Sequence, residues 1–280
     1  MDATEGEATS EVGPTEIVTN AEQLDGSVIF HVVKDVLGFI LYMHQQIPSV
    51  LQDISLEFSE MQTESKELED NLKQTEVKAS LRRQHMGRMR EVKQGIRRLQ
   101  KFMNTISSLE TALQLIISEI PSIQEVILVL GASPIRPQHV YEMTFSHTSA
   151  GSGTISHADF AKSRTVEGLS RKAIRALISN GAGSSSYPGP SKLFLLVKAP
   201  LSFNLPLHFL PKRDFRYSKK IVPFRLRFKC RTQGMDSDPT DCGLNPDRHH
   251  DFKDSTSNEL MWFQCRHVIK GIAFKTPKEE

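Results

Sequence analysis

The sequence has few cysteines, and they are not grouped in pairs. In a chain of 280 residues, the three cysteines form no Cys-x-x-Cys motif. An odd number at wide spacing argues against a disulfide framework and predicts free thiols in a reducing compartment. The three positions are Cys230, Cys242 and Cys265.

Long hydrophobic runs and a signal peptide are also missing. The most apolar stretch, residues 28–41, contains His31, Lys34 and Asp35, and it is shorter than the roughly 20 residues that span a bilayer. The first residues are acidic, unlike the basic start of a secretory signal. We therefore expect no membrane association and a location in the nucleus and cytoplasm.

No motif for catalysis or metal binding stands out. The sequence contains no Gly-x-Ser-x-Gly, His-Glu-x-x-His, Walker or kinase signature. His249 and His250 lie near Cys242, but their spacing fits no zinc ligand scheme. Cys265 and His267 could form a nucleophile pair, yet no orienting group accompanies them. We predict a protein-interaction module without metal or cofactor; a small Cys–His enzyme is the minor alternative.

Charge is balanced overall but unevenly distributed. The formal net charge is +2, which argues against a nucleic-acid-binding protein. Residues 1–26 carry seven acids and no Lys or Arg, so the remainder is about +9. This segment is rich in Ser, Thr and Glu, and we predict a disordered acidic tail, either solubilising or docking on a basic partner.

Helical periodicity marks the first half of the chain. We expect one helix over residues 27–46, capped by Ser27, and a long amphipathic helix from Met89 to Pro121. Residues 58–87 are dense in Glu, Gln, Lys and Ser, which predicts a solvated loop or extension. The basic cluster between Arg82 and Arg98 is typical of the solvated face of such a helix, with nuclear import or nucleic-acid binding as the minor alternative. A coiled-coil scaffold organised by residues 61–118 is the alternative function.

Strand patterns dominate the rest. Residues 126–130 and 140–145 are apolar runs separated by Gly131 and two prolines, which predicts adjacent strands with the first buried on both faces. Further strands are expected at residues 193–197, 221–229 and 260–269. Residues 206–217 read as an exposed basic-aromatic segment, and residues 232–258 as a loop. This order of elements predicts an α+β fold.

A helix is expected over residues 165–179, with Thr165 as its N-cap. It carries two apolar stripes. One stripe consists of Val166, Leu169, Ala173 and Leu177, and the other of Ile174 and Ile178 flanked by Arg171 and Arg175. The second stripe either faces outward, as a partner surface does, or is buried because the helix is sandwiched.

Four blocks of this sequence together resemble the Comet family, the Mad-binding proteins that silence the spindle assembly checkpoint and have a HORMA-like fold. The blocks are ILYMHQQIP before and at Pro48, the hairpin VILVLGASPIRPQHVYEMTFS, the string FLPKRDFRY, and WFQCRHVIKG near the C-terminus. They occur in the family's order and cover about a third of the chain.

The resemblance implies a HORMA-like domain over residues 27–275, with residues 58–87 and 232–258 as variable loops or extensions and residues 276–280 as a tail. Three main helices would pack on a mixed sheet, with a C-terminal region of strands like a safety belt. The intramolecular belt strand would include Trp262, Phe263, Gln264, Lys270 and Gly271.

The resemblance also implies an adapter without an active site. Such a protein binds the closed form of the Mad checkpoint HORMA protein and presents it to a hexameric AAA+ ATPase, which promotes disassembly of the mitotic checkpoint complex. Meiotic HORMA proteins of chromosome axes would be further partners. The expected locations extend to kinetochores, the spindle and meiotic chromosomes.

Residue by residue, the resemblance assigns two surfaces. The ATPase would contact Pro211 and Lys212. Met43 and Ile174 stand where animal members have Gln and Phe, so the resemblance implies a reshaped contact with Mad. The residues expected to face the Mad protein are Met43, His44, Gln45, Arg171, Ile174, Arg175 and Ile178.

Overall fold

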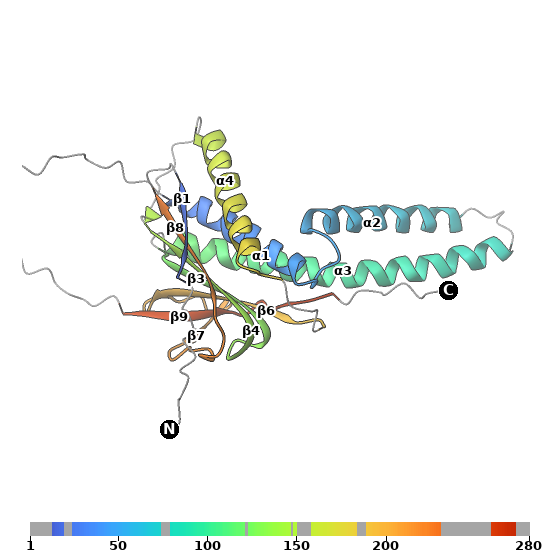
Figure 1. Ribbon diagram of the computed structural model, residues 1–280. Coiled ribbons are helices and arrows are strands. Elements are labelled where there is room, and N and C mark those ends of the chain that lie inside the picture. Colours follow the sequence, from blue (N-terminus) through green and yellow to red (C-terminus); the bar gives the residue numbers. More distant parts are fainter. Residues whose placement is uncertain are drawn as a thin grey trace, which may run out of the picture.

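The computed structural model describes residues 13–19, 24–73, 79–120, 123–146, 148–149, 158–183, 189–230 and 259–272. Within these ranges the chain is α+β, with four helices and a mixed sheet (Figure 1). The prediction of an α+β fold is confirmed, whereas the prediction of three main helices is one helix short. The helices are α1 (Gly26–Met43), α2 (Leu51–Lys73), α3 (Ala79–Glu119) and α4 (Ala158–Ser179).

The main sheet runs in the order β1-β8-β4-β3-β6-β9-β7, with β10 also paired to β6. β3 and β4 form the predicted antiparallel hairpin, and β3 also pairs with β6. β8 is parallel to both β4 and β1. The small strands β2 (Leu24–Asp25) and β5 (Thr148–Ser149) pair separately. The main-sheet strands are β1 (Thr15–Thr19), β3 (Glu125–Ser133), β4 (Arg136–Phe145), β6 (Lys192–Pro200), β7 (Phe209–Lys212), β8 (Phe224–Cys230), β9 (Leu260–Cys265) and β10 (Ile269–Lys270).

The two faces of the sheet are covered differently. The helices cover one face, where α1 contributes a stripe of fully buried aliphatic residues to the main core. A smaller cluster on the other face contains Ile127, Val129 and Leu196, and side chains of residues 215–221 pack against it. Residues 206–217 are therefore not simply exposed, because Phe215 and Tyr217 help cover this second apolar face. Both faces of β3 are buried, as predicted.

The segment predicted as a solvated loop is helical. Residues 58–73 belong to α2, and residues 79–87 form the first turns of α3. The mistake has a physical reason: α2 buries only Ile54 and Ser65, so its composition is that of a solvated segment although its backbone is helical. In Figure 1, α2 (blue) and the first half of α3 (green) extend side by side away from the sheet. We call α2 and residues 79–101 of α3 the helical arm.

Part of the predicted acidic tail is structured. Thr15–Thr19 form β1, which pairs in parallel with β8 and buries Ile17. The cap of α1 is Asp25, not Ser27: its side chain accepts a hydrogen bond of 2.8 Å from the backbone N–H of Val28. α1 ends at Met43, three residues before the predicted end. Residues 1–12 lie outside the described residues.

The C-terminal strand is interrupted. The single predicted strand over residues 260–269 is two strands, β9 and β10, with residues 266–268 between them. β9 lies inside the sheet between β6 and β7. β7 was also missed, because a proline in a short motif argues against a strand; Pro211 is tolerated here since β7 is an edge strand. Residues 232–258 and 276–280 lie outside the described residues.

Other boundaries also shift. α4 begins at Ala158, so Thr165 lies within the helix and is not its N-cap. The strands at residues 193–197 and 221–229 are confirmed as β6 and β8, and along β8 the buried Leu226 and Phe228 alternate with half-buried basic residues. By length and composition alone, α1 could cross a membrane. In this fold α1 is a core helix, with eight buried residues packed against the sheet and helices.

Candidate partner-binding surface

α4 presents one of its two predicted apolar stripes to solvent. Leu169, Ala173 and Leu177 are buried in the main core. Ile174 is half-buried, and Ile178 is 57% exposed. The second stripe therefore faces outward at Ile178 and is partly covered at Ile174, so the helix is not sandwiched. Arg171 and Arg175 flank it and are exposed.

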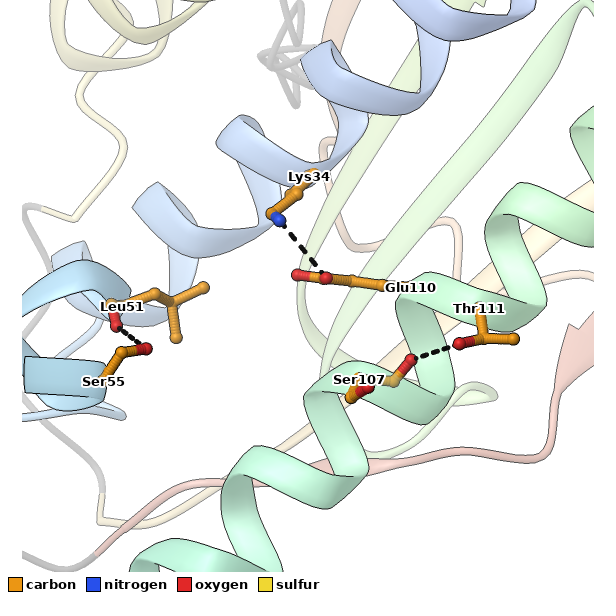
Figure 2. A network of polar contacts seen from close by, with 6 residues as sticks. All are labelled: Lys34, Leu51, Ser55, Ser107, Glu110 and Thr111. Carbon is orange, nitrogen blue, oxygen red and sulfur yellow. Dashed lines mark hydrogen bonds and ion pairs between the residues drawn. The ribbon is translucent and has the colours of Figure 1, made fainter. Parts of the chain in front are cut away.

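A cleft of about 770 Å³ lies beside Ile174. It is formed where α1, α3, α4 and the start of α2 meet. Figure 2 shows the part of this region where Lys34 of α1 faces Glu110 of α3. Its apolar lining comes from all four helices: Phe39, Leu51, Met103, Ile106, Val166 and Ile174. An apolar side chain of a partner could enter this cleft from the α4 face.

The polar groups around the cleft have partners within the chain. Lys34 Nζ lies 3.2 Å from Glu110 Oε2, and the Ser170 hydroxyl donates to Asp35 Oδ2 at 2.6 Å. Arg171 forms an ion pair with Glu167, one helical turn earlier. Because these charges are already balanced, the rim adds polarity without a strong net charge. The arrangement suits binding of an apolar group framed by polar side chains.

His44 does not belong to the surface predicted for it. Its side chain is 7% exposed, and its Nε2 lies 2.5 Å from the hydroxyl of Tyr141 on β4. The His139 ring lies against it, with ring centroids 4.2 Å apart. Burial, helped by His139, lowers the pKa of His44 to about 4, so the ring is neutral at physiological pH. The inward direction of this side chain explains why it cannot contact a partner.

The neighbours of His44 lie differently. Gln45 is exposed and has a positive φ of 53°, which ends the helix. Met43 is half-buried, and a Cβ at Gly183, just after α4, would lie only 2.4 Å from its Cγ. The structure therefore brings Met43 to the C-terminal end of α4. Of the three predicted α1 residues, only Met43 and Gln45 remain candidates for a partner surface.

Gln46, which sequence reasoning did not single out, ties three segments together. Its side-chain oxygen accepts a hydrogen bond of 2.6 Å from the backbone N–H of Ser191, and its backbone oxygen accepts one of 2.7 Å from Ile272. A Cβ at Gly271 would lie 2.3 Å from Gln46 Oε1, so only glycine fits there. The double glutamine at residues 45–46 and the pair Lys270-Gly271 were the available signal, because Gln46 and Gly271 pack against each other.

The predicted ATPase-contacting pair lies on β7. Pro211 and Lys212 are exposed and pair in register with Phe263 and Trp262 of β9. β7 is one edge of the sheet, whereas α4 packs against β1 at the other edge. The two predicted surfaces are thus well separated.

The predicted belt residues lie on β9, on β10 and directly after β10. Phe263 is buried, while Trp262 and Gln264 are half-buried, and the amine of Lys198 lies 5.7 Å from the centre of the Trp262 ring. Lys270 is exposed and pairs in register with Lys192, and Gly271 contacts Gln46. Together these residues hold β9 and β10 against β6 and against the end of α1.

The Cys–His alternative has little chemical support. Cys265 is fully buried, and burial raises the pKa of its thiol to about 11, so it stays protonated at neutral pH. His267 lies 3.1 Å from His208, ring nitrogen to ring nitrogen. Cys230 and Cys265 are free, as predicted, and Cys242, His249 and His250 lie outside the described residues. Within the described ranges no three His, Cys, Asp or Glu side chains gather as metal ligands.

No protein-family model matches this chain, and no curated protein matches it either.

Proposed function

We propose that this protein is a HORMA-like adapter of the Comet type, with no active site of its own. It binds the closed form of the Mad checkpoint HORMA protein and presents it to a hexameric AAA+ ATPase, which supplies the ATP hydrolysis. The observation that carries the proposal is the outward stripe of α4: Ile174 and Ile178 with Arg171 and Arg175, beside an apolar cleft. Half-exposed apolar groups flanked by arginine are characteristic of protein interfaces.

The arrangement of the sheet supports the same proposal. β9 occupies an internal position between β6 and β7, so the chain's own C-terminal region fills the place that a ligand strand could take. Occupied in this way, the sheet offers no long free edge there. This favours recognition through a helix face, with Met43 and Gln45 adjoining it, over recognition by strand addition.

A second surface serves the ATPase in this proposal. Pro211 and Lys212 lie at the β7 edge, away from α4. The separation allows both partners to bind the adapter at once. Meiotic HORMA proteins remain additional partners of the α4 face, and the proposed locations are the nucleus and cytoplasm, with kinetochores, the spindle and meiotic chromosomes.

The scaffold alternative is less well supported. Residues 61–118 use their apolar positions inside the chain, since α2 packs on α3 and the second half of α3 packs on the sheet. An intermolecular coiled coil would need those same positions.

The experiment is a fluorescence-anisotropy titration of the Mad HORMA protein, locked closed or locked open, with this chain. We expect selective binding to the closed form and a loss of about 2 kcal/mol, roughly 30-fold, in Ile174→Asp, because a charge enters a desolvated contact. The matched control is Pro211→Ala with Lys212→Ala, which keeps Mad binding and reduces stimulation of the ATPase. Unchanged binding by a folded Ile174→Asp variant contradicts the assignment of the α4 face. An equal loss of Mad binding in the control variant contradicts the assignment of the two partners to separate surfaces.

A further inference from the structure

The arm half of α3 is strongly basic. Residues 79–101 contain one acid, Glu91, and eight bases. One group of bases faces α2: Arg88 Nε lies 2.6 Å from Glu64 and Lys93 Nζ lies 2.8 Å from Glu69. The eight bases are Arg82, Arg83, Arg88, Arg90, Lys93, Arg97, Arg98 and Lys101.

A second group of bases forms a straight line on another face. Arg83, Arg90 and Arg97 are seven residues apart, and Lys101 follows one turn later. Seven residues are nearly two helical turns, so these side chains share one face and repeat about every 10.5 Å. We call these four residues the α3 cationic stripe. All four are exposed and form no ion pair with any described residue.

The stripe lies on the side of α3 away from its apolar contacts. Val92 and Leu99, which are buried, point about half a helical turn away from Arg90 and Arg97. At its inner end the stripe enters a groove of about 470 Å³ between α3 and the turn after β9. Arg97 and Lys101 line this groove together with His267 and four polar residues of α3. The four are Gln100, Asn104, Thr105 and Ser108.

We propose that the α3 cationic stripe is a docking site for an acidic helix of another protein, with carboxylates repeated every seven residues. The argument is charge complementarity. α3 already binds one acidic helix, α2, through Glu–Arg and Glu–Lys pairs. The stripe offers the same chemistry on the opposite side, where no carboxylate of a described residue pairs with it. The groove at its inner end would fix where the bound helix stops.

The observations favour an acidic helix over nucleic acid. A repeat of about 10.5 Å equals the repeat of side chains along one face of a partner helix, whereas phosphates follow one another far more closely along a nucleic acid strand. Residues 79–101 contain no Phe, Tyr or Trp on which bases could stack. This site is separate from the proposed Mad and ATPase surfaces, so it does not depend on the adapter function.

The test uses a stapled helical peptide of residues 51–73, which has seven acids and two bases, as the probe against the full chain. We expect saturable binding by anisotropy that weakens as salt rises. Arg83→Gln, Arg90→Gln and Arg97→Gln together should weaken it at least ten-fold. The matched control removes the same charge elsewhere, at exposed Arg216, Lys219 and Lys220, and should bind as the unchanged protein does.

Three results would overturn the proposal. A stapled peptide of scrambled order that binds equally well would show attraction to charge alone. Tighter binding of a 20-base-pair RNA duplex would identify a nucleic-acid site. Binding abolished by Arg88→Gln with Lys93→Gln, but kept in the stripe variant, would show that the probe merely replaces α2.

Discussion

The sheet with its covering helices and the helical arm use polar residues in opposite ways. In the sheet region, buried polar groups have partners far away in sequence, such as His44 with Tyr141 and Gln46 with Ser191. In the arm, Asp70 and Lys73 pair within one helix, and Glu64 pairs with Arg88 of the neighbouring helix. Long-range contacts determine the first region, whereas contacts between two neighbouring helices hold the second.

The two regions also differ in how many side chains they bury in the core. The core is continuous from β1 to β10, whereas α2 buries only two residues. The arm is held mainly by half-buried side chains and exposed ion pairs, which are individually weak. It can therefore carry an interaction surface, such as the α3 cationic stripe, without affecting the packing beneath the α4 face.

The largest expected contrast is in core truncation. Leu195→Ala on β6 removes a fully buried side chain from the sheet centre and should lower the free energy of unfolding by about 2–5 kcal/mol. Leu68→Ala in α2, where the side chain is half-buried, should cost about 1 kcal/mol or less because less apolar area leaves water. Urea denaturation measures both. Equal losses would contradict the distinction between the two regions.

A smaller effect is expected from pH. His44 is neutral in the folded protein because its pKa is lowered from 6.5 to about 4, chiefly by burial. The unfolded chain binds a proton at higher pH, so stability should fall as the pH drops from 6.5 towards 4, by roughly 2 kcal/mol. His44→Gln should be less stable at pH 7.5 and show a flatter pH profile in urea denaturation. An unchanged slope would place the titration elsewhere, His139 being the nearest candidate.

Sequence reasoning succeeded where the signal is local. The apolar runs of β3 and β6, the alternation along β8 and the two stripes of α4 each depend on residues within one element. A period of two or of 3.6 residues identifies the buried face directly. These features gave the α+β class and the outward face of the candidate site.

It failed where burial depends on distant partners. Residues 42–46 look polar and exposed, yet His44 and Gln46 are buried because their side chains form hydrogen bonds with Tyr141 and Ser191. β1 is hidden in an acidic segment, because an edge strand needs only Ile17 and Thr19 on its inner side. α2 resembles a loop in composition because nearly all of it is solvated. No pattern within these segments reports the partner that decides their structure.

The smallest contrast concerns ion pairs. Glu142 on β4 accepts hydrogen bonds from the Tyr217 hydroxyl and from Arg225 Nε at 3.0 Å, in a half-buried position. Glu142→Gln should therefore lower the free energy of unfolding by about 1 kcal/mol, since charged hydrogen bonds weaken and the loop over the second apolar face loosens. Glu64→Gln in the arm breaks a pair with Arg88 that is open to water and salt, and should leave the urea midpoint unchanged. If Glu64→Gln proved the more damaging change, the arm would be held by electrostatics and α2 would be part of the cooperative core.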